Sequence, residues 1–192
     1  RFGCSVSVSD DYMVIGAVEE NLDEFGANSI NNAGAAYIYK RNSTGYWSFV
    51  QKVVASDRSA SDYFGISVRI NGTVIVVGAH EQNYDASGAN LMLDPGAAYI
   101  FELDTLSGLW NQTQKIVASD RANYDWFGYS VGVSGNTIVV GAYQNNFDAS
   151  GGSSLSNSGS AYIFEKNIST GVWNETQKIT ANQRSVDDSF GY

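Results

Sequence analysis

The sequence predicts an all-β protein made of three tandem copies of one four-stranded antiparallel unit of about 63 residues, the type of unit that forms β-propeller blades. Three observations lead to this prediction: a Phe-Gly pair recurs, a Gly-Ala pair follows it thirteen residues later, and short apolar runs alternate with turn residues. The Phe-Gly pairs begin at Phe2, Phe64, Phe127 and Phe190. The units therefore span residues 2–63, 64–126 and 127–189, and residues 190–192 start a further one.

The first two strands of each unit are expected to form a hairpin. The first strand alternates polar and apolar residues, as in Ser67–Ile70, which is typical of a strand with one apolar face. A tight turn such as Asn71-Gly72 follows, and Asn-Gly between apolar runs is the strongest short-range hairpin signal. The second strand, as in Thr73–Ala79, is a continuous Val/Ile run, which predicts burial on both faces.

The last two strands of each unit differ in polarity. They follow a loop of about sixteen residues rich in Asn, Asp, Ser and Gly, a length typical of functional or elaborated loops. The third strand joins small residues to aromatics, as in Ala97–Phe101, which suits a wedge-shaped packing layer. Polar residues dilute the fourth strand, which we expect at the outer edge. It begins at Trp47, Trp110 or Trp173.

Composition and charge exclude some classes of function. The chain has 192 residues, of which 43% are hydrophobic, and its 20 acidic and 11 basic residues give a net charge of −9. Nucleic acid is not an expected partner, because its binding requires clustered Lys and Arg. No apolar run approaches the roughly 18 residues of a membrane span, so no membrane insertion is expected. Cys4 is the single cysteine and forms no internal disulfide.

Three units leave open how the structure is completed. Closed propellers have about four to eight blades, so further blades, several chains in one ring, or an open stack of units are all compatible with the sequence. The edge unit of an open stack needs a neighbour. We therefore expect self-association with further repeats or copies, up to a filament.

The recurring motifs resemble a known repeat. Phe-Gly, Gly-Ala thirteen positions on, and Gly-Ala-Ala-Tyr-Ile at Gly34 and Gly96 are similar to the FG-GAP repeat of integrin α-subunit heads, and closer to the FG-GAP-like repeats of bacterial and protist surface proteins. The resemblance covers the whole chain. It implies β-propeller blades in extracellular or cell-surface proteins used for adhesion, ligand binding or scaffolding.

Two departures from the family pattern limit what the resemblance implies. The proline of Gly-Ala-Pro is replaced by Val18, His80 and Tyr143. Integrin-type blades often carry an Asp-x-Asp-x-Asp-Gly calcium loop between the first two strands, whereas here that connection is a minimal hairpin such as Asn71-Gly72. The family's metal site is therefore not transferred, and we expect no metal site and no cofactor, with calcium kept as an open alternative.

Five Asn-x-Ser/Thr sequons predict N-linked glycans. Because strands alternate in direction, the turn after the first strand and the turn after the third lie at the same end of a unit, and all five sequons fall in or beside these turns. They are Asn42, Asn71, Asn111, Asn167 and Asn174. We therefore expect one glycosylated end and an opposite end that is free for protein or glycan partners.

The opposite end carries repeated acidic residues and one unmatched tryptophan. Oxygen ligands at close spacing suit a hard cation such as calcium, but aspartates also cap turns and pair with nearby arginines, which is the reading we favour. Trp126 stands where the other units have Tyr63 and Ser189, and exposure would suit it for contacts. The candidate contact residues are Asp23, Asp85, Asp148, Asp62, Asp125, Asp188 and Trp126.

Other features suggest packing or local contacts. One tryptophan per unit at fixed phase favours repeat packing over a sugar-stacking stripe. Leu91-Met92-Leu93 interrupts a polar loop in the second unit only. These residues would either form a contact patch or fold under their own loop. His80 is the only histidine, and near-identical units offer no distinguished pocket, so we expect no enzyme activity.

The sequence as a whole favours an extracellular structural or adhesive glycoprotein module that acts as a non-catalytic scaffold. Two alternatives stay open. A lectin or glycan-processing propeller would use the carboxylates and Trp126. A calcium-dependent adhesion receptor head would use the acidic loops.

Overall fold

The computed structural model describes residues 1–192 and contains twelve β-strands and no helix, so the predicted all-β class is confirmed. No segment forms a helix of the length and apolar character needed to cross a membrane. The strands are β1 Phe2–Ser9, β2 Tyr12–Ala17, β3 Ala35–Arg41, β4 Trp47–Val53, β5 Ser67–Asn71, β6 Val74–Ala79, β7 Ala97–Asp104, β8 Leu109–Ile116, β9 Phe127–Ser134, β10 Thr137–Ala142, β11 Ser160–Lys166 and β12 Trp173–Ile179.

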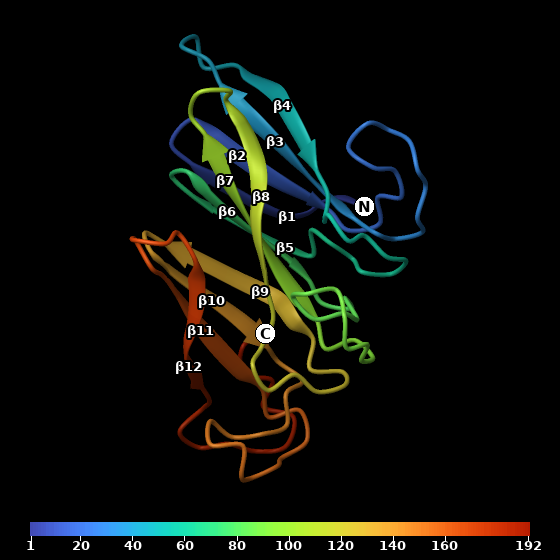
Figure 1. The fold of residues 1–192 in the computed structure, drawn as a ribbon, viewed down its shortest axis with the longest axis vertical. Helices are drawn as coiled ribbons and strands as arrows, with labels where there is room; N and C mark the ends of the chain where they lie inside the picture. The colour runs from blue at the N-terminus through green and yellow to red at the C-terminus, as the bar shows by residue number, and fades with distance from the viewer.

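The strands form three four-stranded antiparallel sheets, one per repeat: sheet 1 (β1–β4), sheet 2 (β5–β8) and sheet 3 (β9–β12). In each sheet the strands lie side by side in chain order, so the fourth strand is the outer edge, as predicted. The first strands β1, β5 and β9 contact one another across the sheets and form the inner side. Figure 1 shows sheets 1 and 2 above sheet 3, and the sheets do not close into a ring.

The two ends of the sheets differ. The short-turn end carries the turns between the first and second strands and between the third and fourth. These turns touch at the ends of the sheets, where the Leu103 backbone N–H donates to the Thr73 carbonyl at 3.0 Å. The long-loop end carries the loops between the second and third strands and the connectors between sheets, which project to the right and bottom of Figure 1.

The sheets touch along their inner strands through the repeated glycines. A Cβ built on Gly78 would lie 1.8 Å from the Gly128 carbonyl oxygen of the next Phe-Gly pair, so only glycine allows this approach of two backbones. The Ser67 hydroxyl donates to the same carbonyl at 2.8 Å. Phe-Gly of one unit thus docks on Gly-Ala of the unit before it, which explains why both motifs recur in phase.

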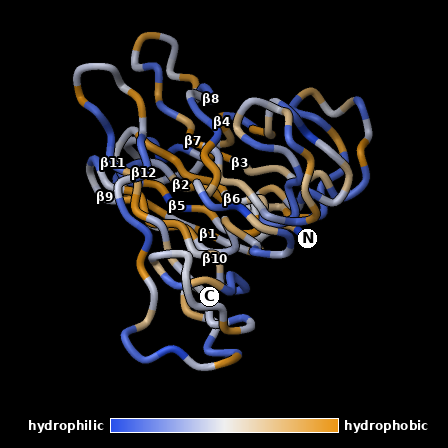
Figure 2. The backbone as a smooth tube through the Cα atoms, turned by 60° about the horizontal axis from the view of Figure 1, so that its bottom comes forward, coloured by the Kyte–Doolittle hydropathy of each residue, from blue (hydrophilic) through white to orange (hydrophobic).

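Two hydrophobic clusters fill the spaces between the sheets. One lies between sheets 1 and 2 and includes Ile38, Phe64 and Trp110, and the other lies between sheets 2 and 3 and includes Phe127 and Trp173. In Figure 2, hydrophobic stretches gather where the strands crowd together, and hydrophilic stretches lie mainly along the projecting loops. Each core is therefore an interface between repeats, as in other repeat proteins.

The second strand meets its predicted burial only in the middle sheet. All six residues of β6 are buried, whereas β2 and β10 each leave residues partly or fully exposed. The physical reason is that sheet 2 has a neighbour on both faces, while sheets 1 and 3 each have one uncovered face.

Candidate functional site

All five sequon asparagines are exposed and lie at the short-turn end. Asn42 and Asn167 stand at the start of β3–β4 and β11–β12 turns, where their side-chain oxygens accept backbone N–H groups from Thr44 and Ser169. The Asn71 oxygen accepts the Gly135 backbone N–H of the neighbouring sheet at 2.9 Å. Exposure of the asparagine is what attachment of a glycan requires.

The acidic residues of the long loops organise their own loops. The two carboxylate oxygens of Asp23 accept hydrogen bonds from the Phe25 and Ala27 backbone N–H groups and from the Asn28 side chain. These bonds, led by that of Ala27, hold the pKa of Asp23 below its usual value. Asp85 and Asp148 accept backbone N–H groups of the equivalent turns in the same way. Their pKa values are lowered first by the hydroxyls of Ser87 and Ser150, which donate to them, and then by other hydrogen bonds of the turn. No group of three or more His, Cys, Asp or Glu side chains is placed to hold a metal ion.

The connector arginines bind loop backbone instead of pairing with aspartates, contrary to our expectation. The Arg58 guanidinium donates to the Asn21 and Asn28 carbonyls at 2.8 and 3.2 Å. Arg121 and Arg184 repeat this pattern in the next two units. A guanidinium presents several donors in one plane, so one side chain binds the connector to two separate points of the long loop.

Three of the candidate contact aspartates are buried in the chain and offer a partner little surface. Asp62 and Asp125 are 0% and 1% exposed, and Asp23 is 6% exposed. The Asp62 carboxylate accepts the Ser59 backbone N–H at 2.6 Å and the Gln82 side chain at 2.9 Å. Burial raises the pKa of Asp62 to about 7 and that of Asp125 to about 6. Asp85, Asp148 and Asp188 stay at least partly accessible.

A polar network crosses each junction between sheets. At the junction of sheets 1 and 2, the Asp57 carboxylate accepts the Tyr99 hydroxyl at 2.8 Å and the Lys115 ammonium at 2.7 Å. Gln82 joins Tyr99 to Asp62 from the other side. The Asp57 charge is thus neutralised by a lysine of the next unit, which is 5% exposed, so the network adds specificity to an apolar interface.

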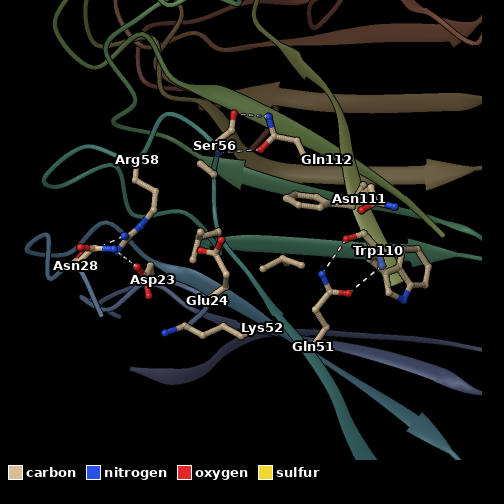
Figure 3. Close-up of a pocket in the computed structure, with 14 residues that line it drawn as sticks. Asp23, Glu24, Asn28, Gln51, Lys52, Ser56, Arg58, Trp110, Asn111 and Gln112 are labelled. Atoms are coloured by element: carbon tan, nitrogen blue, oxygen red, sulfur yellow. Dashed lines mark hydrogen bonds between the residues drawn. The ribbon is translucent and has the colours of Figure 1, made fainter. Parts of the chain in front are cut away.

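A groove runs along each junction on the outer side, and Figure 3 shows the one between sheets 1 and 2, of about 380 Å³. The Gln51 side chain donates to the Trp110 carbonyl and accepts the Trp110 backbone N–H, both at 2.9 Å. The amide side chain thus makes the two hydrogen bonds that a paired strand would make with Trp110, and it links β4 to β8. Gln114 and Trp173 repeat these two hydrogen bonds in the equivalent groove of about 700 Å³ between sheets 2 and 3.

Trp126 is half-buried in an aromatic cluster, so it is less exposed than a free contact residue would be. Its ring lies 5.2 Å from the His80 ring and 6.2 Å from the Tyr129 ring, centroid to centroid. With Tyr63 and Glu81 these side chains line a pocket of about 400 Å³ at the long-loop end. His80 is 7% exposed, and its burial lowers its pKa to about 4, so the imidazole is neutral near pH 7.

The uncovered face of sheet 1, which we call the leading face, is an apolar surface outside the two cores. Phe2, Val6 and Val8 are 58%, 61% and 64% exposed on it. The equivalent Phe64, Val68 and Ile70 of sheet 2 are buried against sheet 1. The face continues over Met13, Ile15, Tyr37, Tyr39, Trp47 and Phe49. The opposite, trailing face of sheet 3 exposes Val139.

Sequence reasoning missed the junction residues. Gln51 and Trp110 are far apart in the chain, and a glutamine in an edge strand is normally expected to face solvent. The available signal was that Gln51, Gln114 and Gln177 recur at one phase of the repeat. Of the second-unit patch, Leu91 and Leu93 are exposed and Met92 is half-buried and lines the groove between sheets 2 and 3.

A solved structure shares the arrangement of sheets. The crystal structure of Saccharomyces cerevisiae Sqt1 aligns over 96% of this chain with a TM-score of 0.54 and 10% sequence identity. Identity at this level shows a similar fold alone. The chain spans 36% of the length of the Sqt1 chain. No curated protein matched in a sequence search.

The family model described as the FG-GAP repeat matches three segments, residues 1–39, 47–101 and 110–164. Each match includes the docked motifs: a Phe-Gly pair, the Gly-Ala pair on which the next unit packs, and the third-strand Tyr-Ile. The matches together cover most of the sequence and follow the three sheets in order. The chain therefore belongs to the FG-GAP repeat family.

Proposed function

We propose that the chain is a non-catalytic module of an extracellular scaffold or adhesive protein, one that needs no cofactor and that extends by packing further FG-GAP sheets. A single observation carries this proposal. The leading face of sheet 1 presents, uncovered, the same pattern of side chains that sheets 2 and 3 bury against their neighbours. An apolar face of this size in water favours association with a matching surface.

Sedimentation over a range of protein concentrations tests the proposal. Val6→Lys places a charge on β1 in the leading face and should shift the protein toward monomer. Leu106→Lys is the matched control, because Leu106 is 98% exposed in the β7–β8 turn, away from this face. A wild-type protein that stays monomeric at all concentrations, with no difference between the two variants, would contradict the proposal.

The glycan part of the proposal has its own test. The five exposed sequon asparagines share the short-turn end, so glycans there would leave the leading face and the long loops uncovered. Two of them, Asn111 and Asn174, line the grooves between the sheets. The protein secreted from a eukaryotic host should lose mass on enzymatic removal of N-glycans. Asn42→Gln should remove the mass of one glycan. An unchanged mass of the wild-type protein would exclude glycosylation in that host.

A second candidate function is glycan binding in the pocket beside Trp126. The pocket joins the rings of Tyr63, Trp126 and Tyr129 to the Glu81 carboxylate, and sugars bind through aromatic stacking together with hydrogen bonds to carboxylates. A glycan array measures this directly. Binding that is lost in Trp126→Ala and kept in Trp47→Ala would support a lectin, and an array without signal would remove this candidate.

A further inference from the structure

We infer that the partner of the leading face of sheet 1 is sheet 3 of a second copy of this chain, so that copies join head to tail. The inference deepens the proposed packing of further FG-GAP sheets and depends on it. It follows from the way in which each junction between sheets balances its buried charge.

Each internal junction contains one tyrosine, one lysine, one carboxylate that pairs with the lysine, one amide, and a second, buried carboxylate beside the amide. The second carboxylate is Asp62 at the first junction and Asp125 at the second. Between sheets 1 and 2, Tyr99 and Lys115 bind the Asp57 carboxylate, and Gln82 supplies the amide. Between sheets 2 and 3, Tyr162 and Lys178 bind Asp120 at 2.7 and 2.6 Å, and Asn145 supplies the amide. In both, the carboxylate comes from the earlier sheet's connector and the amide from the later sheet's long loop.

Sheet 1 departs from this arrangement. The residue at the amide position is Glu20, which accepts the Tyr37 hydroxyl at 3.0 Å and pairs with Lys52 at 3.3 Å within the same unit. A preceding connector with aspartates at both usual places would bring the number of carboxylates around this lysine to three. Because three carboxylates around one lysine leave one more unbalanced charge than the internal junctions have, sheet 1 fits a partner with a neutral residue at the place of Asp57 and Asp120.

Sheet 3 carries that neutral residue. After sheet 3, the connector has Gln183 where the earlier connectors have Asp57 and Asp120. Arg184, which follows it, binds the Asn146 carbonyl as Arg58 and Arg121 bind theirs, so the phase of the repeat is kept. Sheet 3 against sheet 1 of a second copy therefore restores one tyrosine, one lysine, two carboxylates and one amide. Glu20 and Gln183 exchange the places of one carboxylate and the amide, and Asp188 takes the place of Asp62 and Asp125.

Other groups on the two faces match as well. Gln177 of sheet 3 is exposed and stands at the same phase as Gln51 and Gln114, whose side chains hydrogen-bond to the backbone of the next sheet's tryptophan. In the proposed junction, Gln177 would meet Trp47 of sheet 1 in the second copy. Val139 lies exposed on sheet 3, opposite the exposed Val6 region of an incoming sheet 1. One contact of the internal junctions would be missing. Between sheets 1 and 2, the Gln112 side chain accepts the Ser56 backbone N–H, but sheet 1 has Phe49 at the position of Gln112.

Docking requires one rearrangement. Residues 190–192 occupy the place on sheet 3 that the Phe2-Gly3 pair of an incoming copy would take: the Ser130 hydroxyl donates to the Gly191 carbonyl, and Gly159 pairs with Phe190. The incoming Phe2-Gly3 displaces them. Deletion of residues 190–192 should therefore strengthen association, since it removes the competing segment.

Mixing two variants tests the direction of association by sedimentation. Val6→Lys blocks the leading face and Val139→Lys blocks the trailing face, and each residue is exposed, so both variants should keep the thermal melt of the wild type. Each variant alone should be monomeric. The equimolar mixture should form a 1:1 dimer, because one intact face of each kind remains. A Val139→Lys variant that still associates, or a mixture that stays monomeric, would overturn the head-to-tail inference.

Exchanging the carboxylate tests the charge argument. Gln183→Asp should weaken association about tenfold, and adding Glu20→Gln should restore it, because the pair then has the pattern of the internal junctions. Asp188→Asn should strengthen association, since Asp188 would meet Glu20 where Asp62 meets Gln82. Association of the wild type that none of these changes alters would leave the proposed function standing and refute the partner assigned here. A monomeric wild type would refute both.

Discussion

At the scale of single residues, the Gly-Ala and Phe-Gly motifs mark the positions where the backbones of neighbouring units touch. Gly16, Gly78 and Gly141 each stand where a Cβ would lie 2.0 Å or less from the carbonyl of the following Phe-Gly pair. A serine hydroxyl donates to that same carbonyl in every unit. The recurrence of Phe-Gly and Gly-Ala could be found in the sequence. Their contact could not, because it joins residues about fifty positions apart, Gly78 and Gly128 among them.

Gly78→Ala should therefore lower the free energy of unfolding by about 3 kcal/mol, at the upper end of overpacking costs, because the methyl group must push two sheets apart. Chemical denaturation measures the change. Gly132→Ala is the control, since a Cβ there meets nothing closer than 4.0 Å. Equal stability of the two variants would show that the sheets separate at little cost.

Asp62 should make stability depend on pH. Its buried carboxyl has a pKa raised to about 7 from the model-compound value of 3.8, so the folded state holds the proton more tightly than the unfolded state. This contribution is present below pH 3.8 and is lost as the pH rises toward 7. Asp62→Asn mimics the protonated form and should gain stability relative to the wild type over that range.

Urea denaturation of both proteins at several pH values measures the Asp62 effect. Asp10→Asn removes the same charge from an exposed turn and serves as the control. The comparison with wild type also cancels the opposite trend from His80, whose lowered pKa reduces stability as the pH falls toward 4. Parallel pH profiles for Asp62→Asn and the wild type would contradict the assigned pKa.

At the scale of elements, alternation and turn chemistry predicted the strands well, and burial of the tryptophans was foreseen from their fixed phase. Trp110 and Trp173 are 1% and 2% exposed, in agreement with repeat packing, while Trp47 is half-buried on the leading face. The burial of some candidate contact residues, such as Asp62, shows the limit of this reasoning. A polar residue in a connector reads as exposed, and only the fold reveals that the next sheet covers it.

The tryptophans supply a prediction for the outer strands. Trp110→Ala should cost about 3–5 kcal/mol, because it empties a filled site between sheets 1 and 2. Trp47→Ala in the monomeric protein should cost only about 1 kcal/mol, because the ring is already half in water. Thermal unfolding of the two variants at low protein concentration gives the comparison, and similar losses would mean that Trp47 is covered even in the monomer.

At the scale of the whole molecule, stability should be highest in the middle. Sheet 2 has a core on each side, and all six residues of β6 are buried. Amide hydrogen exchange should therefore be slowest in β6 and faster in β1, whose residues are mostly exposed, and in β12. Protection of β1 equal to that of β6 in dilute protein would contradict this order.

The boundaries of the matched family repeats differ from the boundaries of the sheets. The second and third matched repeats begin at Trp47 and Trp110, so each supplies the outer strand of one sheet and then three strands of the next. An unequal recombination that inserts or removes one whole repeat therefore leaves no interior sheet short of a strand. Arrays of this type can change length in evolution one repeat at a time. Every inserted copy contributes strands to two adjacent sheets.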